Sequence, residues 1–137
     1  MEQISLARAS YTDRNDKMVT EIYLVCGNGG TQEAKERVTS YLSLLSKGEV
    51  VAEHIRDIYA YLDESVTTAD AGDKHFIVGL ADAIKGKRIV SKDGGYGEVS
   101  RTIVRAHNAI EACNKVGDDW QVPISVTRLP YIADIIR

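Results

Sequence analysis

The chain of 137 residues has few of the residues that mark small specialised classes of protein. It contains only two cysteines, two prolines, one tryptophan and one phenylalanine. Cys26 and Cys113 are too few and too far apart for a disulfide-stapled secreted domain, and both fall on predicted apolar faces, so we expect free thiols. No apolar run approaches the length of a membrane span, and the first residues show no basic-then-apolar leader pattern. We therefore expect a cytoplasmic protein without membrane attachment.

The chain also lacks a strong net charge. Its 17 Lys and Arg nearly balance its 20 Asp and Glu and leave a net charge of −3. Such a chain has no global positive field to draw it onto duplex nucleic acid or an anionic membrane. The HExxH, CxxC and Gly-x-Ser-x-Gly patterns are missing, and His54, His75 and His107 are not spaced as metal ligands. We expect no metal and no cofactor, and the balance leans against an enzyme.

Hydrophobic residues make up 44% of the chain, and their spacing predicts secondary structure. Residues 3–11 and 18–26 alternate between apolar and polar, and the turn formers of 12–16 lie between them, which predicts a β-hairpin. Residues 120–129 alternate in the same way and predict a third strand. Because Pro123 cannot donate to a β-ladder, we expect this strand at a sheet edge or at its own start.

Helical spacing is typical of four further segments. These run from Thr31 to Gly48, over 51–62, from about Asp70 to Lys85, and from about Glu98 to Val116. Within the last of them, 99–104 could instead be a strand, because Asp93-Gly94 is also a hairpin signal. The fold class predicted is α+β, in which a small antiparallel sheet, made of the N-terminal hairpin and the C-terminal strand, is covered by about four helices. We find no internal repeat and no linker, so we expect a single domain over 1–137.

Two glycine clusters are the main pointers to a ligand. Gly27-Asn28-Gly29-Gly30 follows the apolar run 21–26 and precedes a predicted helix that Thr31 would cap. Unpaired amides at a helix start can bind an anion, so Gly29, Gly30 and the Thr31 hydroxyl are candidate phosphate-binding groups. The P-loop lysine and the spaced dinucleotide fingerprint are both absent. A flexible turn with no ligand is the alternative interpretation.

The second cluster, Gly94-Gly95-Tyr96-Gly97, lies in the only local concentration of basic residues. Amides at a helix start and neighbouring guanidinium groups could together hold a phosphate, and Tyr96 could stack on a base. A solvated basic loop is the alternative interpretation. The candidate ligand-binding residues from this region are Lys87, Arg88, Lys92, Gly95, Tyr96, Gly97, Arg101 and Arg105.

The function predicted from these clusters is non-enzymatic binding of a phosphorylated or nucleotide-like small molecule, in the manner of a small regulatory protein. The alternative is a protein-interaction or inhibitor module that acts through an apolar, tyrosine-bearing surface. Its residues would be those of the unusually apolar last segment, Tyr131, Ile132, Ile135 and Ile136. Either function favours a homo-oligomer, because a small sheet with an edge strand leaves surface that a second copy could cover.

A third alternative is a small nuclease or hydrolase. Arg101 followed by His107 on a predicted helix resembles the Arg–His signature of HEPN ribonucleases, in which the two side chains face one site across a dimer. The resemblance covers one helix and implies catalytic roles for Arg101 and His107. On a helix the two side chains would point about 120° apart, Thr102 stands where a polar residue often follows the Arg, and the predicted strands are unlike that all-helical family.

Overall fold

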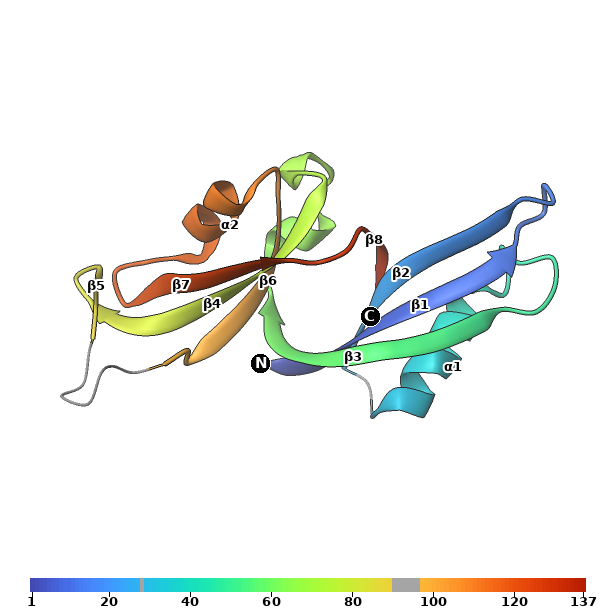
Figure 1. The fold of residues 1–137 in the computed structure, drawn as a ribbon, viewed down its shortest axis with the longest axis horizontal. Coiled ribbons are helices and arrows are strands. Elements are labelled where there is room, and N and C mark those ends of the chain that lie inside the picture. Colours follow the sequence, from blue (N-terminus) through green and yellow to red (C-terminus); the bar gives the residue numbers. More distant parts are fainter. Residues whose placement is uncertain (28, 90–96) are drawn as a thin grey trace. The chain divides into compact units, whose positions relative to one another are not determined.

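The computed structural model describes residues 1–27, 29–89 and 97–137 (Figure 1). This part of the chain forms eight strands, two α-helices and two short 3-10 helices. Their bounds are β1 Glu2–Thr12, β2 Met18–Cys26, α1 Thr31–Leu42, β3 Val51–Leu62, η1 Glu64–Thr67, η2 Ala69–Ala71, β4 Lys74–Ile84, β5 Lys87–Arg88, β6 Ser100–Ala106, α2 Ala109–Val116, β7 Gln121–Arg128 and β8 Ile132–Ile136. The chain divides into two compact units, of which unit 1 is Met1 with Ala60–Pro130 and unit 2 is Glu2–Tyr59 with Tyr131–Arg137.

Unit 2 contains a sheet in the order β3-β1-β2-β8. Strands β1 and β2 form the predicted hairpin, and the Asp13 carboxylate closes its turn by accepting from the amides of Asn15 and Lys17 at 2.9 and 3.0 Å. Strand β8 runs parallel to β2, with Ile136 opposite Val25. Helix α1 packs against this sheet (Figure 1).

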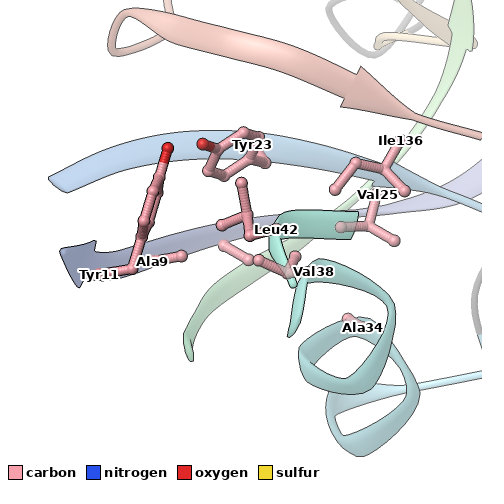
Figure 2. Close-up of a cluster of buried hydrophobic side chains, with 9 residues drawn as sticks. Ala9, Tyr11, Tyr23, Val25, Ala34, Val38, Leu42 and Ile136 are labelled. Atoms are coloured by element: carbon pink, nitrogen blue, oxygen red, sulfur yellow. The ribbon is translucent and has the colours of Figure 1, made fainter. Parts of the chain in front are cut away.

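The core of unit 2 lies between α1 and the sheet (Figure 2). Val38 and Leu42 of the helix point at the strands, where Val25 and Tyr23 meet them, and Ala34 allows the first turn to come close. Burying a side chain the size of Leu42, which is 1% exposed, contributes roughly 1.5–3 kcal/mol. Alternate residues of β1 face this helix, as the predicted period of two requires.

Unit 1 contains a sheet in the order β7-β4-β6, with β4 antiparallel to both neighbours. The last residues of β3, Tyr61 and Leu62, pair in parallel with β6. Strand β5 forms a short hairpin with the end of β4. Helix α2 packs on one face, where Ala112 meets Phe76, Val78 and the rest of a second apolar cluster.

The two units repeat one arrangement. Each has two antiparallel strands, a helix that packs on them and a further strand, so that β1-β2-α1-β3 corresponds to β4-β6-α2-β7. In each unit the second strand also takes a parallel neighbour on its outer side, which is β8 for β2 and the end of β3 for β6. The sequence-based expectation of no internal repeat is therefore wrong.

The predicted fold class is also wrong. The described residues are dominated by eight strands in a mixed arrangement, and they include two α-helices rather than about four. The hairpin and the strand near 120–129 are confirmed, and the helix that begins at Thr31 is confirmed as far as Leu42, although it was expected to run to Gly48. The helices expected over 51–62 and from Asp70 to Lys85 are strands β3 and β4.

Strand β4 was missed because it is buried on both faces. Its apolar residues form a nearly continuous run rather than an alternation, and a run of that kind cannot be separated from a buried helix by periodicity. The segment from Glu98 to Val116 is strand β6 followed almost directly by helix α2, so the 99–104 alternative of a strand is confirmed. The apolar spacing passes through the junction because both elements face the same core.

The last segment of the chain is not the open apolar surface that the sequence suggested. Ile132 and Ile136 are buried in β8, while Tyr131 is 71% exposed. Pro123 lies in β7, whose pairing in the described part of the chain is with β4 alone, so the edge position expected for this proline is confirmed.

Candidate functional site

A pocket of about 420 Å³ opens in unit 2 where β2 ends and α1 begins. The chain leaves the strand at Gly27, with φ of 56°, and enters the helix through Gly30, with φ of 133°, which are backbone conformations that favour glycine. This strand–turn–helix order is the one expected from the first glycine cluster. The pocket is lined by Glu2, Cys26, Gly27, Glu33, Arg37 and Arg137.

Two guanidinium groups line this pocket, and neither is among the candidate residues predicted from the sequence. Arg37 lies on the second turn of α1 and donates to the carbonyl oxygen of Cys26. Arg137 directly follows β8 and is exposed. No local pattern links Arg37 and Arg137, because they lie 100 positions apart in the sequence. The parallel pairing of β8 with β2 brings them to one place.

The pocket also carries carboxylates. Glu33, in the first turn of α1, accepts from the amide of Gly29. The chain's own carboxylate therefore occupies part of the position that an anion would take. Burial and the nearby charge of Glu2 raise the pKa of the Cys26 thiol to about 11, against the opposing effect of Arg137 and Arg37. The thiol is therefore protonated and a poor nucleophile at neutral pH.

The cap of α1 differs from the expected one. Gly30 is the N-cap, Thr31 is the first helical residue, and α1 has no side-chain cap hydrogen bond. The Thr31 side chain is exposed. Gly29 and Gly30 do lie at the helix start as predicted, although the amide of Gly29 is already engaged by Glu33.

The second glycine cluster does not precede a helix. Lys92, Gly95 and Tyr96 lie outside the described residues, and Gly97 leads into strand β6. Lys87 and Arg88 form β5 and are exposed. The helix-start amides expected beside Gly97 are therefore absent from this segment, because the residues that follow it form a β-ladder with β4.

Arg101 and Arg105 lie on strand β6 and engage different partners. Arg101 Nε donates to Glu98 at 2.6 Å, and Arg105 Nε donates to the carbonyl oxygen of Gly72 at 2.5 Å. The two residues are four steps apart along the strand, which places their Cα atoms about 13 Å apart. The structure thus places both arginines on one strand without bringing them together around one anion.

The structure does not place the two residues of the catalytic alternative on one helix. Arg101 is on β6, whereas His107 lies between β6 and α2 and its Nδ1 contacts Glu111 at 3.0 Å. Hydrogen bonds from Lys115 first and then His107 lower the pKa of the Glu111 carboxyl. The HEPN-like pairing on one helix is therefore wrong, since its two residues have separate partners.

A serine, a histidine and an aspartate do meet in unit 2, but not in the order of a nucleophilic triad. Ser5 Oγ donates to Asp57 Oδ1 at 2.6 Å, and His54 Nε2 lies 2.9 Å from the same oxygen. A triad needs the histidine next to the serine, as its base. Here the carboxylate lies between them, and the bonds from Ser5 and His54 lower the pKa of Asp57. The cluster fits a structural role.

His75 lies in an environment that no local sequence pattern predicts. This side chain on β4 is 6% exposed, and its Nδ1 has no hydrogen-bond partner. Burial, and then the charge of Arg105, lower the pKa of His75 to about 4. The ring is therefore neutral at physiological pH.

Comparison with known proteins gives no family: no family model matches the chain, and no curated protein or solved structure shows significant similarity to it. Among the described residues, no cluster of three or more histidine, cysteine, aspartate or glutamate side chains is arranged to bind a metal ion. No helix in residues 1–27, 29–89 and 97–137 has the length and apolarity needed to cross a membrane.

Proposed function

We propose that this chain is a small, non-enzymatic binding protein that holds a phosphorylated or nucleotide-like ligand in the pocket at the start of α1. The observation that supports it is the convergence of two guanidinium groups, Arg37 and Arg137, on a pocket of about 420 Å³. Arginine forms charge-assisted, often bidentate hydrogen bonds with phosphate. The positive end of the helix dipole adds to this preference for an anion.

In this proposal the Glu33 carboxylate occupies the position of the ligand's phosphate while the pocket is empty. Its carboxylate holds the amide of Gly29 when no ligand is bound, and a phosphate displaces it. The exposed position of Glu33 allows its side chain to turn outward into water. The pocket is close to neutral with Glu2 and Glu33 facing Arg37 and Arg137, so ligand binding leaves it anionic unless Glu33 moves away.

A thermal-shift screen against nucleotides, cyclic nucleotides and sugar phosphates tests the proposal. A ligand at a hundred times its Kd adds about 2.7 kcal/mol to the free energy of unfolding. We expect Arg37→Gln to remove the shift and Glu33→Gln to increase it, because the second change removes the competing carboxylate. Lys35→Gln on the same helix is the control, since Lys35 does not line the pocket. The absence of any shift across the screen would refute the proposal.

A further inference from the structure

The two helices begin with a shared sequence pattern. Residues 33–38 read Glu-Ala-Lys-Glu-Arg-Val and residues 111–116 read Glu-Ala-Cys-Asn-Lys-Val. The alanine is completely buried in each unit, as Ala34 and as Ala112. The start of α2 in unit 1 is therefore the counterpart of the pocket at the start of α1 in unit 2.

The basic residue of the pattern has the same contact in both units. Arg37 donates to the carbonyl oxygen of Cys26, in the last residue of the strand before its helix. Lys115 Nζ donates to the carbonyl oxygen of Arg105, near the end of the strand before its own helix, at 2.7 Å. The two contacts are equivalent in kind, although the acceptor is the last residue of β2 in one unit and the residue before the end of β6 in the other.

In unit 1 the place that corresponds to the pocket is filled by the chain itself. Lys115 Nζ also donates to the carbonyl oxygen of Ala71 at 2.8 Å, and Arg105 Nε donates to that of Gly72 at 2.5 Å. The backbone amide of Arg105 donates to Ser65 Oγ at 3.0 Å. The acceptors at this site are thus two peptide carbonyls and a hydroxyl of a single backbone segment.

This segment, residues 64–72, makes close contact with the strand end. A Cβ at Gly72, where φ is 134°, would overlap the backbone of Ala106 and His107. Val66 is 5% exposed and anchors the segment through its side chain. Glycine is therefore required at position 72, where the segment passes the strand end. In unit 2 the strand end is followed by Gly27, which lines the open pocket.

We infer that the pocket of unit 2 binds a segment of polypeptide backbone from a partner, in the way that unit 1 binds its own residues 64–72. The partner segment is rich in small residues, and its carbonyl oxygens accept hydrogen bonds from Arg37 and Arg137. This ligand class goes beyond the proposed phosphorylated molecule, and it stands on the occupant seen in unit 1 rather than on the charge of the pocket.

A synthetic peptide, Glu-Ser-Val-Thr-Thr-Ala-Asp-Ala-Gly, which copies residues 64–72, is the probe. Titrated into the ¹⁵N-labelled full chain, it is expected to produce saturable NMR shifts at Cys26, Gly27 and the Arg37 side chain. Arg37→Gln should weaken binding about tenfold, the loss expected for a hydrogen bond from a charged donor, and Arg37→Lys should restore part of it. Lys35→Gln is the matched control and should leave the affinity unchanged.

A second peptide, in which valine replaces the final glycine, should not bind, because the added side chain has no room beside the strand end. The inference is overturned if the copied peptide produces no shifts, if its shifts fall only on unit 1, or if Arg37→Gln binds it with unchanged affinity. A parallel titration with inorganic phosphate separates the two proposals. Peptide binding without phosphate binding keeps this inference and counts against the proposed function, and the reverse result keeps only the proposed function.

Discussion

Single residues in unit 1 are fixed by backbone contacts that no side-chain pattern reveals. Gly72 combines a φ of 134° with a backbone neighbour that leaves no room for a Cβ. We expect Gly72→Ala to lower the free energy of unfolding by about 2–4 kcal/mol, through backbone strain and displacement of its segment. Urea denaturation measures the change. Gly48→Ala is the control, since no atom lies within 4 Å of its added Cβ, and equal losses in both variants would contradict the assignment.

His75 makes the stability of the protein depend on pH. Its pKa is about 4 in the folded chain against 6.5 for an ordinary histidine, so the unfolded chain binds more protons between these values. The contribution of the neutral ring is complete above pH 6.5 and is lost as the pH falls from 6.5 through 4. We expect His75→Gln to flatten the fall in unfolding free energy over this window. A parallel pair of wild-type and His75→Gln profiles would contradict the prediction.

At the scale of elements, local signals predicted the hairpin and α1 but not β3 and β4. The hairpin was predictable because its strands alternate and Asp13 marks the turn. Helix α1 was predictable because Ala34 and Val38 share a helical stripe, although Tyr41 and Leu45, expected on the same stripe, are exposed. Strands β3 and β4 were not, because their apolar residues also fit a helical spacing. Pairing with neighbouring strands decides between helix and strand. The local sequence does not reveal that β3 pairs with β1 or that β4 pairs with β6.

The residues of the candidate site also differ in whether the local sequence predicts them. Gly29 and Gly30 were found because a strand, a turn and a helix follow one another in the chain. Arg37 was visible only as one of several charges on a helix, and Arg137 reaches the pocket through the parallel pairing of β8 with β2. The basic cluster near Arg101 and Arg105 was an effect of sequence proximity, since a strand spreads neighbours that a helix would gather.

Each helix depends on one small residue for its approach to the sheet. Ala34 in α1 and Ala112 in α2 are both completely buried. A larger side chain forces the helix away from the strands, so Ala34→Leu and Ala112→Leu should each cost about 1–3 kcal/mol of unfolding free energy. Glu36→Leu, on the exposed side of α1, is the control. Chemical denaturation of the three variants checks this, and a neutral effect at either alanine would mean that its helix does not lie against the sheet as described.

For the whole molecule, the repeated arrangement explains the division of the chain into two units, which its composition does not predict. The chain is short and yet forms two compact units, because each unit needs only a small sheet and one α-helix. The repeat was present in the sequence as Glu-Ala followed by a basic residue and valine, at 33–38 and 111–116. The first copy lies near the start of the helix expected from Thr31, and the second lies at the end of the helix expected to run to Val116, so the predicted elements did not place the two copies at corresponding positions.

The same architecture leaves apolar surface that a second copy of the chain can cover. Leu44, Ile110 and Trp120 are each at least 66% exposed, and strand β7 offers an edge. We therefore expect a homodimer in solution, with a mass by light scattering of twice 15.1 kDa at micromolar concentration. Leu44→Lys in unit 2 and Trp120→Lys in unit 1 identify the interface, because a buried lysine at the contact dissociates the dimer while one outside it does not. A single particle of 15.1 kDa for the unaltered chain would remove the prediction, since the exposed side chains would then simply face water.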